Sequence, residues 1–145
     1  MTSAREGDAQ ATQSSVSAEL SVRRGREAVE FYKAAFDAVE VYRVGGTEHH
    51  QEVVAQLVLG NANFWVSDES PPNGHFSPES LGGSTVRLLL VVEDPHSVVD
   101  RAVSLGARLV APVHEEHRWL LGRIEDPFGH QWEIGKPLVH WPPPP

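Results

Sequence analysis

The feature that most constrains this chain is an internal repeat, in which one pattern of elements returns at an offset of 70 residues, from Leu20 to Leu90. Residues 20–22 (LSV) precede the first expected helix as residues 90–92 (LVV) precede the second. Each half consists of one strand, one helix and three strands. Because one such unit cannot bury both its helix and its sheet, two units must pack together and leave a concave pocket. The sequence therefore predicts an α+β fold, in which two βαβββ modules form a paired, curved mixed sheet around a central pocket.

The first module begins with a strand at residues 18–22, where apolar and polar side chains alternate with the period of a half-buried strand. A helix follows, because an apolar stripe recurs at helical spacing. Its members are Ala28, Phe31, Tyr32, Ala35 and Phe36. Three short strands are expected at residues 39–44, 53–59 and 62–66.

The second module begins after a long irregular segment, residues 68–84, which contains three prolines and three glycines. A strand is expected at residues 85–92 and a helix at 95–105, which Asp94 caps and Pro95 begins. Further strands are expected at residues 108–112, 118–124 and 130–134, with a type I turn at 126–129 before the last of them.

These elements predict one domain with two tails. The expected boundaries are residues 1–15 for a disordered tail, 16–136 for the domain and 137–145 for a proline-rich tail. Within the domain, module one is expected at 16–67, a linker or lid loop at 68–84 and module two at 85–136. The four final prolines favour an extended, solvated segment over one that docks on an aromatic groove.

Composition excludes several classes of function. The chain contains no cysteine, which excludes a disulfide, a thiolate metal site and a cysteine nucleophile. The formal net charge is -8 and the 12 lysines and arginines are scattered, a pattern unsuited to nucleic acid. No stretch is apolar enough for a secretion signal or a membrane span. We therefore expect a cytoplasmic protein that contacts neither nucleic acid nor membrane.

Three stretches carry a family resemblance: residues 28–36 (AVEFYKAAF), 80–84 (SLGGS) and, most specifically, 122–134 (GRIEDPFGHQWEI). Together they resemble the glyoxalase/bleomycin-resistance (vicinal oxygen chelate) superfamily, in particular its glyoxalase-like members. The resemblance covers about residues 16–136 and implies paired βαβββ modules and frequent homodimers. It also implies activities ranging from metal-dependent isomerases, lyases and extradiol dioxygenases to thiol transferases acting on fosfomycin and metal-free proteins that sequester antibiotics.

Metal-using members of this superfamily place one ligand on each of four strands, leaving two open positions for the substrate. By the resemblance, Glu133 matches the acidic ligand of the last strand. Arg87 stands where relatives have histidine, and its guanidinium has no lone pair for a cation. Ser17 takes the equivalent position in the first module, and the fourth ligand position falls on Trp65 or Phe64. We therefore expect no metal, with Glu133 as the only matching ligand.

Arg87 and Glu133 support two interpretations. In the first, they face each other across the former metal site as a charge-assisted pair. In the second, Arg87 points into solvent along the sheet edge and Glu133 is a relic of the family.

Further side chains are expected to line the pocket. Trp65 is the aromatic residue expected to reach it, whereas Trp132, opposite Glu133 by alternation, is expected in the core. Residues 114–117 (HEEH) are expected in a loop or strand start at the pocket rim, because their histidine spacing does not fit a helical zinc motif. A solvated turn with Trp119 packed beneath it is the alternative. The expected ligand-binding set is Arg87, Trp65, Leu89, His117, Arg118, Trp119 and Ser17.

Two classes of function follow. The leading hypothesis is that a homodimer binds a small organic ligand in the inter-module cavity, without a cofactor. The alternative is an enzyme, either a lactoylglutathione-lyase-like isomerase with Glu133 as ligand and catalytic base, or an extradiol dioxygenase. Such an enzyme would use zinc, nickel, manganese or iron. The sequence leaves open whether modules pair within one chain or between two chains.

Overall fold

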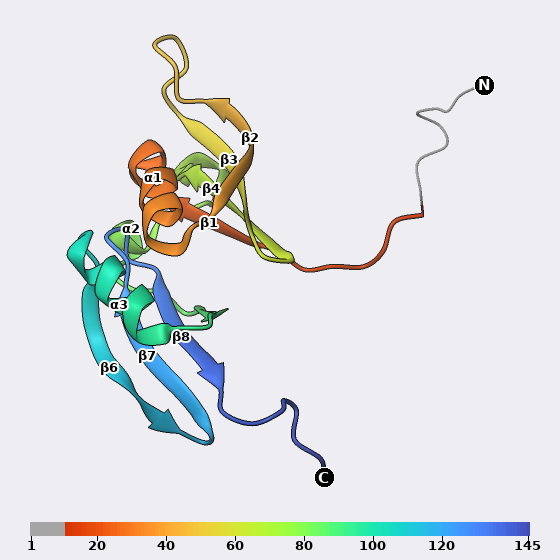
Figure 1. The fold of residues 1–145 in the computed structure, drawn as a ribbon. Coiled ribbons are helices and arrows are strands. Elements are labelled where there is room, and N and C mark those ends of the chain that lie inside the picture. The colour runs from red at the N-terminus through yellow and green to blue at the C-terminus, as the bar shows by residue number, and fades with distance from the viewer. Residues whose placement is uncertain (1–10) are drawn as a thin grey trace.

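The computed structural model describes residues 11–145, so the first ten residues of the expected tail lie outside the described residues. The first module consists of β1 (Ala18–Val22), α1 (Gly25–Phe36), β2 (Val39–Gly45), β3 (Val53–Leu59) and β4 (Ala62–Asp68) (Figure 1). The second consists of β5 (Arg87–Val91), α3 (Pro95–Ser104), β6 (Arg108–Glu116), β7 (Trp119–Glu125) and β8 (Gln131–Pro137). Between the modules lie a short 3-10 helix, η2 (Pro71–Asn73), and α2 (Pro78–Leu81).

Each module contributes one four-stranded mixed sheet, with strand orders β1-β4-β3-β2 and β5-β8-β7-β6. In each sheet the first strand runs parallel to the last strand of its module, and the other neighbours are antiparallel. The sheets stay open, with β1 and β5 as edge strands. The predicted α+β fold of two βαβββ modules is confirmed.

The first turn of α1 is held by an aspartate from another element. The backbone amide of Gly25 donates to Asp68 Oδ1 at 2.9 Å, although the N-cap residue Arg24 supplies no side-chain bond. A Cβ at Gly25 would lie 2.6 Å from Asp68 Oδ2. Glycine at this position therefore allows β4 to cap the helix closely.

The second helix begins as predicted. Asp94 Oδ1 accepts from the backbone amide of Ser97 at 3.2 Å, and Pro95 occupies the first turn. The helix ends at Ser104, one residue before its expected end at Leu105.

The two modules share one aromatic core. Trp132 of β8 lies 5.8 Å from Phe64 of β4 and 4.8 Å from Phe36 of α1, measured between ring centroids. Phe31 of α1 likewise contacts Phe128 in the β7–β8 turn. The helix-bearing faces of the two sheets therefore converge, with α1 against α3 (Figure 1).

The opposite, open faces of the sheets consequently point away from each other. Alternation along β4 places Trp65 opposite Phe64, and alternation along β8 places Glu133 opposite Trp132. Since Phe64 and Trp132 meet in the core, Trp65 and Glu133 lie on different outer sides. Within residues 11–145, the central rows of the two open faces therefore do not face each other.

Several boundaries differ from the sequence predictions. β6 continues to Glu116 instead of ending at Pro112, because residues 114–116 pair with Leu121, Leu120 and Trp119 of β7. β8 continues to Pro137. The segment 68–84, predicted as irregular, contains α2, which Ser77 caps by accepting from the amide of Ser80 at 3.1 Å. Among residues 11–145, no helix is long and apolar enough to cross a membrane.

Candidate functional site

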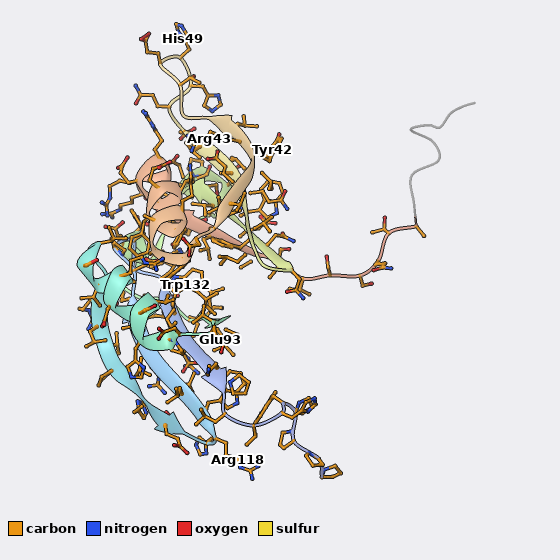
Figure 2. The ribbon with its side chains drawn as sticks, viewed as in Figure 1. Tyr42, Arg43, His49, Glu93, Arg118 and Trp132 are labelled. Atoms are coloured by element: carbon orange, nitrogen blue, oxygen red, sulfur yellow. The ribbon has the colours of Figure 1, made fainter. Side chains whose placement is uncertain are left out.

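The first open face is the side of the β1–β4 sheet opposite α1. One row of paired residues crosses it, from Tyr42 on β2 through Gln56 on β3 and Trp65 on β4 to Glu19 on β1. The rings of Tyr42 and Trp65 meet edge to face, with centroids 5.9 Å apart. This face therefore presents an aromatic pair at its centre, and Figure 2 shows Tyr42 on the side away from α1.

Three polar side chains form a hydrogen-bonded group beside this aromatic pair. The hydroxyl of Ser17 donates to Asn63 Oδ1 at 2.8 Å, and Gln56 Nε2 donates to the same oxygen at 3.2 Å. All three side chains are partly buried. The side chain of Ser17 is thus committed to Asn63.

The second open face is the side of the β5–β8 sheet opposite α3, and a ladder of charges crosses it. Arg123 Nε donates to Glu133 Oε2 at 3.1 Å, and Arg87 Nε lies 3.9 Å from Glu133 Oε1. Arg123 also lies 3.9 Å from Glu116, whose carboxylate contacts His114 at 3.1 Å. Glu133 therefore lies between two arginines, and the closer one is Arg123.

His114 ends this ladder. Its Nδ1 lies 2.8 Å from the carbonyl oxygen of Pro112, and its Nε2 faces the Glu116 carboxylate. The Pro112 carbonyl, followed by Glu116, raises the pKa of His114 above its ordinary value, because both acceptors favour the doubly protonated ring.

The β6–β7 hairpin closes with two left-handed residues. His117 has φ 52° and Arg118 has φ 66°, which are the backbone angles of a type I′ turn. Trp119, the next residue, lies 5.4 Å from Trp141 between ring centroids. The C-terminal tail therefore covers part of this end of the second open face, and Figure 2 shows Arg118 at the hairpin tip.

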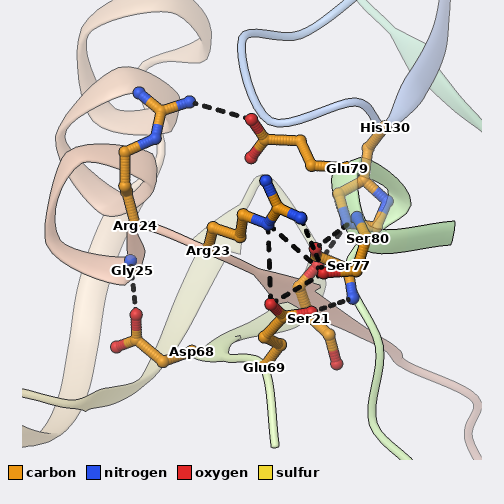
Figure 3. A network of polar contacts seen from close by, with 10 residues as sticks. All are labelled: Ser21, Arg23, Arg24, Gly25, Asp68, Glu69, Ser77, Glu79, Ser80 and His130. Carbon is orange, nitrogen blue, oxygen red and sulfur yellow. Dashed lines mark hydrogen bonds and ion pairs between the residues drawn. The ribbon is translucent and has the colours of Figure 1, made fainter. Parts of the chain in front are cut away.

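The segment between the modules is tied to the loop that joins β1 to α1 by a polar network (Figure 3). Arg23 donates to Ser80 Oγ at 3.1 Å, and that hydroxyl donates to Glu69 Oε2 at 2.9 Å. The amide of Ser77, which donates to Glu69 at 2.8 Å, is the main reason that the pKa of Glu69 lies below its ordinary value. Across the same region, His130 Nε2 donates to the Ser21 carbonyl at 2.9 Å. The segment is thus anchored at several points.

The structure divides the predicted site residues between the two open faces. It brings Arg87, Leu89 and Glu133 together, with Leu89 and Glu133 directly paired across β5 and β8. It places Trp65 and Ser17 on the other sheet, and His117, Arg118 and Trp119 at the hairpin end. A cavity of about 350 Å³ between β4 and β5 includes Leu89 and Asn63 in its lining, together with core residues such as Phe64 and Trp132.

Sequence reasoning missed Arg123, Gln56 and Asn63. Arg123 lies within the signature stretch 122–134, and alternation back from the turn would have placed it opposite Glu133. Gln56 and Asn63 are polar residues inside strands that are otherwise mostly apolar, and this was the available signal.

The strand register resolves the fourth position expected for a metal ligand. Leu89 pairs with Glu133 in the second sheet, and Glu19, 70 residues before Leu89, pairs with Trp65 in the first. The counterpart of Glu133 is therefore Trp65, whereas Phe64 is in the core. The four positions hold Ser17, Trp65, Arg87 and Glu133, a set that does not fit a metal centre because only the carboxylate is a strong ligand. Among residues 11–145, no group of three or more histidine, aspartate or glutamate side chains is arranged to hold a metal ion.

Paired βαβββ modules with open mixed sheets define the class of fold, and comparisons with known proteins agree. The X-ray structure of an Arabidopsis thaliana gene product has 31% sequence identity and a TM-score of 0.64, over 86% of this chain and 98% of that one. TioX from Micromonospora sp. ML1 has a TM-score of 0.67 and 22% identity, over 87% of this chain and 100% of that one. The fosfomycin resistance protein FosX from Listeria monocytogenes, complexed with Mn(II) and sulfate, has a TM-score of 0.64 and 12% identity, over 87% of this chain and 93% of that one.

The family model described as a glyoxalase-like domain matches residues 17–135. The chain therefore belongs to the glyoxalase-like family, within the vicinal oxygen chelate superfamily. An uncharacterized protein of Mycobacterium tuberculosis is 33% identical over 141 residues, which cover 92% of this chain and 82% of that protein.

Proposed function

We propose that this protein reversibly binds a small organic ligand between the first open face of one copy and the second open face of another. The observation that carries the proposal is the division of the site. Aromatic and amide groups lie on one outer side of the chain, whereas the arginines around Glu133 lie on the other. A second copy, packed so that its second open face covers the first open face of this one, would bring the two halves of the site together.

Exposed apolar side chains support the dimer. Val39 of β2 is 60% exposed, and Leu89 and Val91 of β5 are each 52% exposed. Such side chains on the faces of two sheets are typical of a surface that another protein covers. Charged side chains are also unevenly divided between the two open faces. Glu19 is the charged residue in the central row of the first face, whereas the second face carries the ladder of arginines and glutamates.

Binding without a metal is favoured over the metal-dependent alternatives. Glu133, the one matching ligand, already contacts two guanidinium groups, so a cation there would have to compete with both. An isomerase, lyase or dioxygenase of this superfamily needs a metal for its Lewis-acid chemistry. We therefore propose a ligand-binding protein, with its place of action in the cytoplasm.

Titration with 8-anilinonaphthalene-1-sulfonate, an aromatic anion whose fluorescence rises on binding, tests the proposal. We expect Trp65→Ala and Arg87→Ala each to weaken binding several-fold. Arg101→Ala is the matched control, because Arg101 lies on α3 and pairs with Asp37. Unchanged binding in both site variants would contradict the shared site.

Sedimentation and elemental analysis complete the test. We expect a dimer, and we expect Val54→Arg, on the first open face, to lower both dimerisation and dye binding. Stoichiometric zinc, nickel, manganese or iron in untagged protein would instead favour the enzymatic alternative.

A further inference from the structure

We infer that the first open face recognises a planar ring ligand that carries a lactam edge, meaning a ring N–H beside a carbonyl oxygen. This inference rests on the proposed binding function and names its ligand class. It depends on two side chains, Gln56 and Asn63, which we call the amide pair.

The amide pair presents one donor and one acceptor side by side. Asn63 Oδ1 accepts from both Ser17 and Gln56, which leaves the Asn63 amino group as a donor and Gln56 Oε1 as an acceptor. If both amides were turned over, Asn63 would present the acceptor and Gln56 the donor, so the complementary edge is the same. A lactam satisfies both groups at once.

The aromatic pair lies next to the amide pair. Gln56 is the direct cross-strand neighbour of both Tyr42 and Trp65, whose rings contact each other. A flat ring whose edge reaches the amides can therefore pack against Trp65 or Tyr42. Aromatic contacts of this kind contribute about 0.5–1.5 kcal/mol beyond the area that they bury.

The neutrality of the amide pair favours a neutral edge over a charged one. Ser17, Gln56 and Asn63 carry no charge, and a carboxylate placed against them would lose hydration without gaining an ion pair from the first open face, whose central row holds Glu19. Sites that hydrogen-bond a particular polar group discriminate strongly against analogues that lack it, because the site's own groups are then left unpaired.

The test compares two flat compounds, 2-quinolone and N-methyl-2-quinolone, which differ in the ring N–H. We expect wild-type protein to bind 2-quinolone about tenfold more tightly, because N-methylation removes the hydrogen bond from the ring N–H and leaves its acceptor in the amide pair unpaired. Gln56→Met and Asn63→Leu keep similar side-chain volumes. The variant that removes the acceptor of the ring N–H should abolish this preference, and the variant that removes the donor should weaken binding of both compounds, because both keep the carbonyl oxygen.

Circular dichroism melting of each variant identifies any loss of folding, and Gln51→Met, at an exposed position in the loop between β2 and β3, serves as the matched control. Equal affinity for both quinolones, or no binding of either while the anilinonaphthalene dye still binds, would overturn the lactam inference alone. Loss of dye binding from wild-type protein would instead overturn the proposed function.

Discussion

Tyr32 of the first module donates its hydroxyl to the carboxylate of Asp126 in the β7–β8 turn of the second module. The same carboxylate accepts from the indole nitrogen of Trp132 at 2.9 Å and from the backbone amides of Phe128 and His130 at 2.9 and 3.0 Å. Asp126 is only 3% exposed. One buried carboxylate with four donors therefore joins both modules.

Replacement of Asp126 is expected to be much more damaging than replacement of Tyr32. Asp126→Ala leaves four donors, three of them buried, without their acceptor and should lower the free energy of unfolding by at least about 3 kcal/mol. Tyr32→Phe removes one donor to the carboxylate and should cost about 1.5 kcal/mol. Urea unfolding measures both, with the exposed Asp100→Ala as control. Equal costs for the two variants would show that the carboxylate is not the centre of the network.

The hydroxyl of Tyr32 is also expected to lose its proton only at a pH above the ordinary tyrosine range. Burial, together with the Asp126 charge, raises the pKa of Tyr32 well above its ordinary value. Because the folded pKa is the higher one, its contribution to stability is complete below the ordinary tyrosine pKa and is lost as pH rises beyond it. In a spectrophotometric titration, part of the tyrosinate absorbance should appear only on alkaline unfolding. Tyr32→Phe should lack that part, and its presence there would contradict the assignment.

The raised pKa of His114 predicts a second dependence of stability on pH. This dependence is smaller than that of Tyr32 and falls in a lower pH range. The charged ring, held by the Pro112 carbonyl and Glu116, stabilises the fold below the ordinary histidine pKa. This contribution is lost as pH rises through the folded value, and the nearby Arg123 opposes it. His114→Ala should therefore lower the melting temperature more at about pH 5 than at about pH 8. A difference of the opposite sign would contradict this geometry, and His96→Ala, on α3, is the control.

The hairpin tip offers a stabilising substitution. Neither His117 nor Arg118 favours the left-handed backbone that the turn imposes. The double change His117→Asn and Arg118→Gly supplies the residues that type I′ turns prefer, and should raise stability by about 1–2 kcal/mol. Thermal melting measures the gain. If dye binding falls while stability rises, the hairpin tip contacts the ligand, as the sequence analysis expected.

The sequence was sufficient to predict the fold, because the local signals for helices and strands agreed with the 70-residue repeat. Asp94 and Pro95 marked the start of α3, and the apolar stripe of α1 contains the side chains that enter the shared core. The relative direction of the sheets was not predictable in this way. Alternation shows that Trp65 and Glu133 are each opposite a core residue, but only the contact between Phe64 and Trp132 shows that their faces diverge.

The candidate site was predicted less completely for a related reason. Arg87 and Glu133 were assigned from the positions of metal ligands in relatives, and that comparison does not identify a residue such as Arg123, which has no counterpart among the ligands. Arg123 follows instead from the β7–β8 register, which counting outward from the turn at 126–129 gives, because Arg123 pairs with Glu133. The role of Asn63 similarly depends on pairing between β1 and β4, which are far apart in the sequence, because this pairing brings Ser17 to its side chain.

Glu133 lies between Arg123 and Arg87 and partly neutralises both. Glu133→Gln keeps the shape of the side chain and removes its charge, so both guanidinium groups become free to attract an anion. We expect this variant to bind 8-anilinonaphthalene-1-sulfonate about threefold to fivefold more tightly, since partly exposed ion pairs are worth up to about 1 kcal/mol. Arg87→Ala in the same background should reverse the gain. Weaker dye binding by Glu133→Gln would instead indicate that the carboxylate itself contacts the ligand, as the enzymatic alternative requires.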